Sequence, residues 1–319
     1  MIRITSPSRL HLSLIDLNAE IGRVDGGLGI TLDYPKMELT AEKSDNITVT
    51  GNSALNERVK NAVKSVLPDG KGINLNIEDD IPPHVGLGSG TQSALSAASA
   101  VNEVYNLGLD VRELAEKVGR GGTSGIGVAS FESGGFLVDA GHKFNKKEGF
   151  SPSAASKADP APIVFRHDFP DWDIIMALPH GQGAHDAKEV DIFNKECPIP
   201  LNEVQEISHL ILMQIIPAIL ENDIDTFGRG INHLQSTGFK KREIALQSED
   251  IKNLIRFMND TGAKGCGMSS FGPDVFGFSD SKLQSKKIRE DVQSMLDDTV
   301  GGHAIITSAN NTGANISEV

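Results

Sequence analysis

The clearest chemical signal in the chain is a glycine-rich segment at residues 81–100. Two prolines precede three glycines, Gly86, Gly88 and Gly90, and a run of Ala, Ser and Leu then predicts a tightly packed helix from residue 91. Glycines let the backbone bend, and an anionic oxygen can approach the unpaired N–H groups of a helix N-terminus without meeting a Cβ. The segment therefore predicts a phosphate site. The alternative is a glycine-rich turn that caps an ordinary helix.

The loop does not match two familiar nucleotide-binding patterns. No lysine follows Gly90 at the spacing of the P-loop, and the glycines do not have the G-x-G-x-x-G spacing of dinucleotide-binding folds. The side chains of Ser89, Thr91 and Gln92 offer further donors at the mouth of the predicted site. The sequence therefore predicts an anion cradle of another type.

Charged residues gather in a second stretch near the N-terminus. Strand-like alternation places Arg9 and His11 opposite a row of leucines, and a glycine-rich loop with Asp16, Arg23 and Asp25 follows. Loops that combine charges with glycines are often functional. Each group also has a non-functional interpretation. Arg9 and His11 would then lie on a solvent-exposed strand face, and Asp25 would only form a turn.

Composition limits the class of protein. The chain has 319 residues, a net charge of −13, 39% hydrophobic and 23% charged residues, which is typical of a soluble globular protein with one large or two medium domains. The negative charge and the single Trp argue against nucleic acid or an anionic membrane as the main partner. No apolar stretch approaches the length of a membrane span and the N-terminus lacks the charged-then-apolar layout of a signal peptide, so we expect a cytoplasmic protein. Cys197 and Cys266 lack any neighbouring ligand pattern, so neither a disulfide framework nor a zinc site is indicated.

Periodicity predicts alternating helices and strands that would position these groups. The predicted helices are at 55–67, 109–118, 201–220, 224–234, 249–259 and 281–296, and the predicted strands at 36–41, 47–50, 73–77, 136–139, 172–178 and 304–307. Residues 142–170 are rich in Lys, Ser, Ala and Pro and lack periodicity, so the junction between the two domains is expected there. We place the N-terminal domain at 1–165 and the C-terminal domain at 166–319. A second Gly/Ser loop, at 262–277, runs into a strand of the latter.

Residues 82–90 resemble the P-x-x-x-G-L-G-S-S phosphate loop of the GHMP superfamily, which includes galactokinase, homoserine kinase and mevalonate kinase. Gly90 stands where that group usually has a second Ser. Residues 6–14 and 262–277 resemble two further motifs of the superfamily. The resemblance implies an α+β, two-domain GHMP-kinase-like fold, with an N-terminal mixed sheet that carries the phosphate-loop helix and a C-terminal ferredoxin-like α/β sandwich.

One position departs from the kinase pattern. In the mevalonate kinase branch a segment S-G-x-D precedes a Gly-Gly pair, and its Asp acts on the substrate hydroxyl. Here Gly127 stands in the place of that Asp, and Arg9 stands in the place of an N-terminal Lys. A phosphoryl-transfer enzyme would lack a carboxylate beside its nucleophile, although homoserine-kinase-like members also manage without it.

As a whole, the chain most closely resembles the β-ribofuranosylaminobenzene 5′-phosphate synthases, an archaeal family of the superfamily whose members are not kinases. The match rests on residues 8–11, 15–17, 22–27, 85–92, 119–127 and 268–273. The resemblance implies a pentosyltransferase that condenses phosphoribosyl pyrophosphate with 4-aminobenzoate or 4-hydroxybenzoate. It would release pyrophosphate and carbon dioxide on the route to methanopterin.

The resemblance also implies roles for individual residues. The expected catalytic set is Arg9, His11, Asp16, Arg23 and Asp25. The expected phosphate- and substrate-binding set is Val85, Gly86, Leu87, Gly88, Ser89, Gly90, Thr91, Gln92, Ser124, Gly125, His185, Ser269 and Ser270. The carboxylates would face developing positive charge or hold Mg²⁺, and the cations would pair with the benzoate or the 5′-phosphate. The hydroxyls of Ser269 and Ser270 have an alternative role in the hydrogen bonds of their own loop.

The implied reaction needs Mg²⁺ shared by the pyrophosphate oxygens and no organic cofactor. We expect a homodimer that binds phosphoribosyl pyrophosphate and an aromatic carboxylic acid, without nucleic acid or membrane. His185 and Glu189 have the i, i+4 spacing of a metal pair, but a turn at the start of a helix is the favoured interpretation. Two other functions stay open: an ATP-dependent small-molecule kinase of the same superfamily, and a non-catalytic sensor of sugar phosphates.

Overall fold

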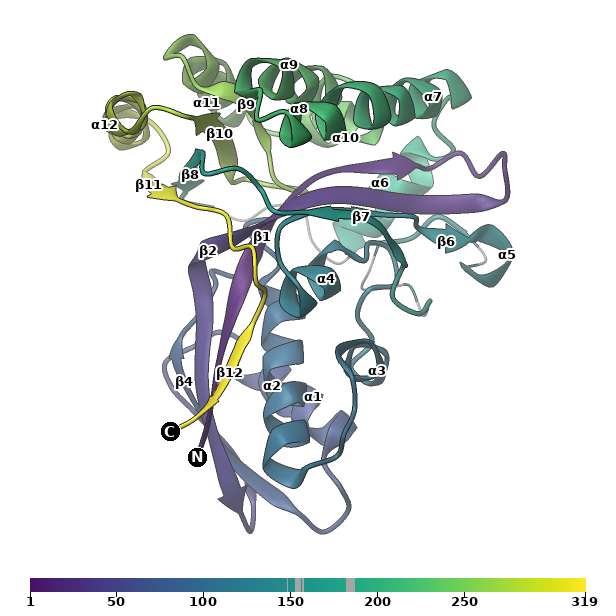
Figure 1. The fold of residues 1–319 in the computed structure, drawn as a ribbon, viewed down its shortest axis with the longest axis vertical. Helices are drawn as coiled ribbons and strands as arrows, with labels where there is room; N and C mark the ends of the chain where they lie inside the picture. Colours follow the sequence, from purple (N-terminus) through teal and green to yellow (C-terminus); the bar gives the residue numbers. More distant parts are fainter. Residues whose placement is uncertain (148, 153–155, 157, 182–186) are drawn as a thin grey trace.

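The computed structural model describes residues 1–147, 149–152, 156, 158–181 and 187–319. Two β-sheets with helices packed on them form the molecule (Figure 1). One sheet has eight strands: β1 (Ile2–Asp16), β2 (Arg23–Ser44), β3 (Ile47–Thr50), β4 (Gly72–Asp79), β5 (Phe136–Asp139), β6 (His142–Lys143), β7 (Ile163–His167) and β12 (Asn315–Glu318). The other has four: β8 (Asp173–Pro179), β9 (Lys264–Met268), β10 (Val275–Ser279) and β11 (Gly302–Thr307).

The helices fall into two groups along the chain. The first is α1 (Asn56–Val66), α2 (Ser89–Tyr105), α3 (Val111–Lys117), α4 (Ile126–Glu132) and α5 (Phe144–Lys147). The second is α6 (Ala187–Glu196), α7 (Leu201–Leu210), the π-helical turn η1 (Ile211–Ile215), α8 (Ile216–Leu220), α9 (Ile224–Gln235), α10 (Gly238–Ala245), α11 (Glu249–Asp260) and α12 (Lys282–Asp298).

The long hairpin of β1 and β2 connects the two halves of the molecule. Its first half packs against α2, and its far end lies beneath α7, α9 and α10 (Figure 1). The pairing of β1 with β2 shifts register between Pro7 and Ser8 and again between His11 and Ser13. Such β-bulges re-aim side chains and are common beside functional sites. Arg9 and His11 lie between the two bulges.

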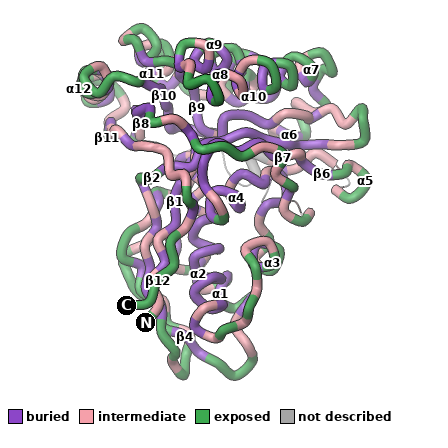
Figure 2. The backbone as a smooth tube through the Cα atoms, viewed as in Figure 1, coloured by how far each residue is buried: buried purple, intermediate pink, exposed green. Residues whose placement is uncertain are grey.

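The N-terminal sheet is mixed, because β3 pairs with β4 in parallel and the other ladders are antiparallel. Helix α2 lies against β1 and β2, and Figure 2 shows it buried over most of its length. Its Ala and Ser side chains allow this close approach, since small residues leave room for a neighbouring backbone. Helix α3 begins with a capping box, in which Asp110 and Glu113 each accept the other's backbone N–H.

The C-terminal sheet is antiparallel, in the order β11-β8-β10-β9, and is covered on both faces. Successive residues of β8 alternate between two cores, as the pleat of a strand requires. Ile174 and Met176 pack in the main core that includes Phe227 of α9, whereas Ile175 packs with Ile288 of α12. The predicted two-domain α+β fold is confirmed by this architecture.

The chain ends return to the first sheet. β12 pairs with β1, so the termini lie side by side in Figure 1. The boundary that we placed at residue 165 falls inside β7, which pairs with β5.

One helical stretch bears on the membrane prediction. Within the part of the chain that the structure describes, Leu201–Leu220 is long and apolar enough to span a membrane, although 39% of its most apolar window is buried inside the molecule. The expectation that no stretch approaches this length was therefore wrong. The helix predicted at 201–220 does run through Pro217, which lies in the first turn of α8, so Gln214 and Pro217 do not shorten the apolar stretch. A core helix of a soluble protein passes the same test.

Candidate active site around the glycine loop

Three segments that are far apart in the sequence meet at the glycine loop. From β1, Arg9 donates its backbone N–H to Leu87 O (3.1 Å) and its Nη1 to Gly86 O (2.5 Å). From the loop before β10, Ser269 Oγ donates to the same Gly86 oxygen at 2.7 Å. A Cβ at Gly86, where φ is +97°, would lie 2.3 Å from Ser269 O, so this contact requires glycine. The glycine loop is thus held between β1 and residues 268–274.

Further hydrogen bonds connect the glycine loop, β1 and residues 268–274, and we call the place where these three segments meet the junction. His11 N donates to Ser269 Oγ (3.0 Å), and Ser270 N donates to His11 O (2.9 Å). Asp274 N donates to Val85 O at 3.4 Å. Ser269 is fully buried and its hydroxyl both donates and accepts within the junction. This arrangement fits the alternative role that we gave it, which is to hold the loop rather than to bind a phosphate.

The N-terminus of α2 is open to a ligand. Gly88, with φ of +83°, is the N-cap and offers no side chain to the first turn, and that turn has no acidic residue. Gly86, Gly88, Gly90 and Thr91 stay partly exposed, so the loop is not sealed. The first N–H groups and the helix dipole therefore face a place that an anion can reach. Val85 and Leu87, by contrast, bury their side chains and contribute only backbone groups.

Two cations lie close to this junction. The Arg9 side chain passes over Gly88, where a Cβ would meet its guanidinium at 3.3 Å. Lys240 of α10 is fully buried, donates to Ser270 O at 2.8 Å and pairs with Glu243 at 2.5 Å. Burial lowers the pKa of Lys240, and the nearby charge of Arg9 adds to that effect while Glu243 opposes it. The junction therefore carries more positive than negative charge.

His11 is connected to a buried carboxylate through a serine. His11 Nε2 lies 3.2 Å from Ser124 Oγ, which donates to Asp139 Oδ2 at 3.1 Å. Gly125 N donates to the same oxygen, and Gly141 N donates to Oδ1. Since the serine hydrogen goes to Asp139, the histidine must carry its proton on Nε2, and Nδ1 is left as an acceptor.

The surroundings of His11 and Asp139 determine which of these two groups is charged. Burial, with the charges of Arg9 and Lys240, lowers the pKa of His11 well below its ordinary value. Burial raises the pKa of Asp139 to about 6, against the opposing effect of its three hydrogen bonds. At neutral pH the site thus holds a neutral imidazole and an ionised carboxylate. A Cβ at Gly27 would lie 3.0 to 3.2 Å from His11, Ser124 and Asp139, so the group closes around that glycine.

Among the described residues, Thr91 and not a carboxylate lies nearest to the place of the kinase aspartate. The nearest atoms to a Cβ at Gly127 all belong to Thr91, the closest at 3.2 Å. Gln92 is fully buried and its amide donates to Gly127 O at 2.8 Å. Gln92 therefore ties α2 to α4, and its side chain does not reach the mouth of the site as we expected.

Asp25 lies in a separate buried network. Lys147 Nζ donates to both carboxylate oxygens at 2.6 Å, and His142 Nδ1 lies 2.7 Å from Oδ2. Asp25 is 1% exposed and has φ of +70°. Its charge contributes to the raised pKa of Asp139, so the two carboxylates are neighbours. Because its oxygens already have strong partners, Asp25 positions the loop around it and is not an open ligand for a metal ion.

Arg23 and Asp16 have structural partners of their own. Arg23 donates to Ala140 O and Gly141 O, both at 2.9 Å, and lines a cavity of about 590 Å³ with Lys143 and Lys146. Asp16 Oδ1 accepts the backbone N–H groups that follow it, from residues 18 and 19, and so caps the turn of the hairpin. His185 lies outside the described residues.

The described residues offer no ready metal cluster. Within that part of the chain, no group of three His, Cys, Asp or Glu side chains could hold a metal ion. Magnesium can still arrive bound to diphosphate oxygens, which are ligands that it prefers. No step proposed below depends on a metal held by the protein.

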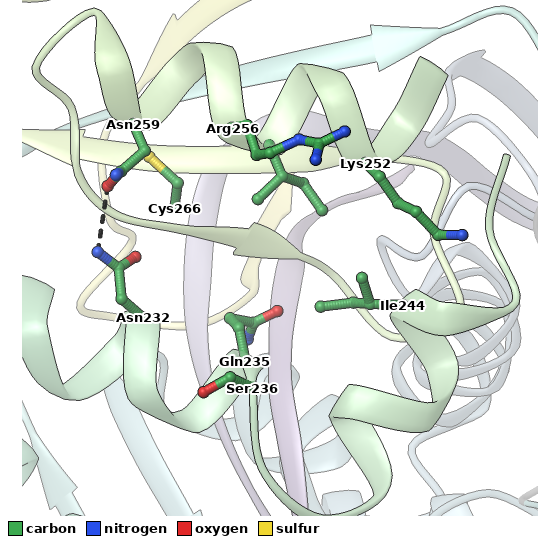
Figure 3. A pocket seen from close by; sticks show the side chains of 9 residues that line it. Asn232, Gln235, Ser236, Ile244, Lys252, Arg256, Asn259 and Cys266 are labelled. Atoms are coloured by element: carbon green, nitrogen blue, oxygen red, sulfur yellow. Dashed lines mark hydrogen bonds between the residues drawn. The ribbon is translucent and has the colours of Figure 1, made fainter. Parts of the chain in front are cut away.

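A further cavity of about 380 Å³ lies between α9, α10 and α11 (Figure 3). Its two cations, Lys252 and Arg256, both face Glu249 of their own helix, and Asn232 donates to Asn259 across the rim. Burial raises the pKa of the Cys266 thiol at its wall to about 12, so this cysteine is a packing residue and not a nucleophile.

The main residues that sequence reasoning missed are Asp139, Lys147 and Lys240. Asp139 ends a correctly predicted strand, two residues before a glycine, and a charge at the end of a buried strand is a signal that could have identified it. Lys240 lies on α10, a helix that we did not predict, and no local pattern indicates its burial.

An open glycine cradle between a mixed sheet and an antiparallel α/β sandwich defines a GHMP-type protein. Residues 54–135 match the family described as GHMP kinases N terminal domain, and residues 215–298 match GHMP kinases C terminal. The crystal structure of homoserine kinase from Cytophaga hutchinsonii is similar over 99% of this chain and 97% of that chain, with a TM-score of 0.71 and 20% identity. This likeness shows the fold.

Two curated relatives are much more similar in sequence. The β-ribofuranosylphenol 5′-phosphate synthase of Methanocaldococcus jannaschii is 46% identical, over 98% of this chain and 99% of its own length. That of Methanothermobacter thermautotrophicus is 45% identical, over 98% and 97%. The chain therefore belongs to the β-ribofuranosylphenol 5′-phosphate synthase family of the GHMP superfamily, and it is an enzyme that transfers a ribose phosphate.

Proposed function

We propose that the enzyme condenses phosphoribosyl pyrophosphate with 4-hydroxybenzoate or 4-aminobenzoate, in methanopterin biosynthesis. The relatives are named for a ribofuranosylphenol product, which favours 4-hydroxybenzoate as the acceptor. The observation that carries the proposal is the combination of an open anion cradle at α2 with the absence, among the described residues, of a carboxylate at Gly127. A site of this kind suits the departure of a diphosphate better than the activation of an alcohol.

The reaction needs no redox cofactor. The bond between the anomeric carbon and the diphosphate breaks, and its electron pair leaves with the diphosphate. The ring carbon that bears the carboxylate attacks the anomeric carbon, and the para hydroxyl or amino group delocalises the resulting positive charge. The bond to the carboxylate then breaks, carbon dioxide leaves, and its electron pair restores the aromatic ring.

The N–H groups at the start of α2 are the natural place for the diphosphate, because fixed donors there cost no reorganisation when charge develops. Arg9 lies beside them and adds a cation that matches phosphate geometry. The carboxyl of Asp139 is ionised at neutral pH, and the Ser124 hydroxyl connects it to His11. It supplies negative charge near the positive charge that develops on the sugar. The cations of the Arg23 cavity suit one of the two remaining anionic groups, the 5′-phosphate or the benzoate.

The test is release of labelled carbon dioxide from carboxyl-labelled 4-hydroxybenzoate and 4-aminobenzoate, measured together with free pyrophosphate. We expect one carbon dioxide for each pyrophosphate, only when phosphoribosyl pyrophosphate and Mg²⁺ are present. Transfer of phosphate from ATP to a hydroxylated metabolite, without carbon dioxide release, would support the kinase alternative. Tight binding of phosphoribosyl pyrophosphate without turnover would support the sensor.

We also propose that the enzyme works as a homodimer in the cytoplasm. Leu212 and Met213 are exposed on η1, at 64% and 62%, and such apolar side chains favour a protein contact. Equilibrium sedimentation of the whole chain measures the oligomeric state, and a monomer at micromolar concentration would contradict the proposal.

A further inference from the structure

A cavity of about 440 Å³ lies near the start of α2, where Ala94 forms part of its wall. It is lined by α1, by α2 and by the segment that follows α3, and two arginines face it: Arg58 of α1 and Arg120. Asn61 and Ser65 add polar groups, and Glu57 is the acidic residue of the lining. The sequence pattern singled out residues 119–127, but nothing in the proposed reaction so far uses Arg120.

Among the described residues, the two arginines have no counter-charge. Across the described ranges, neither guanidinium forms an ion pair, with Glu57 or with any other carboxylate. The Nε of Arg120 is buried and has no hydrogen-bond partner among those residues. Burial, with the charge of Arg58, lowers the pKa of Arg120 to about 10, so the two groups are near enough to repel each other. Buried polar groups and charges are normally paired, so an anion would relieve this arrangement.

The Arg58 side chain connects this cavity to the glycine loop, because its guanidinium lies against Gly90. A Cβ at Gly90 would lie only 1.8 Å from Arg58 Nη1, so the guanidinium occupies the place that a side chain in the first turn of α2 would take. The superfamily pattern has Ser at this position. Glycine at position 90 thus lets the Arg58 guanidinium contact the helix N-terminus, and glycine at position 88 does the same for Arg9.

We propose that Arg58 and Arg120 form an anion subsite, continuous with the N-terminus of α2, that binds the terminal phosphate of the diphosphate group. The assignment to diphosphate rests on the proposed function. The α2 N–H groups then hold the phosphate nearer to the sugar, Arg58 bridges to the outer phosphate, and Arg120 faces it from the cavity. Arginine suits this role because its planar donors pair with phosphate oxygens in a bidentate manner.

The experiment measures binding of inorganic pyrophosphate, with excess Mg²⁺, to the full chain by isothermal titration calorimetry. We expect Arg58→Gln and Arg120→Gln each to weaken binding tenfold or more. The matched control is Arg112→Gln, since Arg112 is a partly exposed arginine of α3 that faces Glu132 at 3.7 Å, and it should change the affinity less than twofold. Equal affinity in all three variants and the wild type would overturn the proposal.

A second variant tests the contact at Gly90 and keeps both arginines. Gly90→Ala must push the Arg58 guanidinium away from the loop, so it should weaken pyrophosphate binding in the wild type and have no further effect in the Arg58→Gln background. Equal effects in both backgrounds would overturn the role of Arg58, even if an arginine variant were to fold poorly. Carbon dioxide release measured on the same proteins separates the two proposals. If the wild type releases carbon dioxide while pyrophosphate binding is unchanged in the variants, only the subsite fails; if the variants lose binding but even the wild type releases no carbon dioxide, only the reaction fails.

Discussion

The junction at Gly86 predicts a large difference between two alanine substitutions that lie four residues apart. Gly86→Ala forces a non-glycine residue to φ of +97° and places its Cβ 2.3 Å from Ser269 O, a backbone atom that cannot rotate away. The strained backbone costs about 1–3 kcal/mol. The shift also breaks the hydrogen bonds that Gly86 O accepts from Arg9 Nη1 and Ser269 Oγ, at about 1 kcal/mol each. The free energy of unfolding should fall by about 3–5 kcal/mol.

Gly90→Ala is the matched control for stability. Gly90 lies within helix α2, and the close atom is the end of the flexible Arg58 side chain. Alanine favours a helix over glycine by about 1 kcal/mol, so this variant should be as stable as the wild type or slightly more stable. Urea unfolding followed by circular dichroism measures both variants. If Gly86→Ala unfolds at the same urea concentration as Gly90→Ala, the loop does not pack on residue 269 as described, and the convergence of the three segments is wrong.

Three further predictions concern buried charges at the same junction. Lys240→Met leaves Glu243 buried without its partner and should lower the free energy of unfolding by about 3–5 kcal/mol, while the double variant with Glu243→Leu should recover most of the loss; urea unfolding of both checks this. The folded pKa of His11 lies below its unfolded value of 6.5, so its contribution to stability is complete above pH 6.5 and declines as the pH falls. The wild type should therefore lose stability relative to His11→Gln between pH 7.5 and 5, and a constant difference would contradict the burial of a neutral imidazole. The carboxyl of Asp274 is fully buried without a hydrogen-bond partner among the described residues, and burial raises its pKa well above the ordinary range of an aspartate. Its favourable contribution to stability is therefore lost as the pH rises, and thermal unfolding should show Asp274→Asn becoming more stable relative to the wild type from pH 4 to pH 7.

Much of the fold follows from local pattern. The predicted strand at 136–139 coincides with β5. The predicted helix at 55–67 begins one residue before α1 and ends one residue after it. Both have strong periodicity or clear boundaries. Helix α10 was missed because its sequence has little amphipathic pattern: Lys240 and Glu243 are buried by their pairing with each other. Strand β12 was missed because its four residues are all exposed and only the edge of β1 holds them in place.

The candidate site was predictable where it depends on glycine. Gly86 and Gly88 mark the loop because their positive φ favours glycine, and a close approach favours glycine at Gly90 as well; the structure places each of the three beside a cation or a backbone carbonyl. The partners of the carboxylates could not be predicted in the same way. Asp25 is charged and directly precedes two glycines, but its pairing with Lys147 spans 122 residues and depends on how the β6 region folds back onto β2. Long-range electrostatic partners leave no local signature.

The central claim is that the loop at Gly86 to Thr91 holds the diphosphate of a sugar donor. A crystal structure of the full enzyme with pyrophosphate and Mg²⁺ tests it most directly. The account predicts diphosphate density in contact with the backbone N–H groups at the start of α2, between the guanidinium groups of Arg9 and Arg58. Diphosphate bound in the Arg23 cavity, with the start of α2 left without an anion, would contradict it.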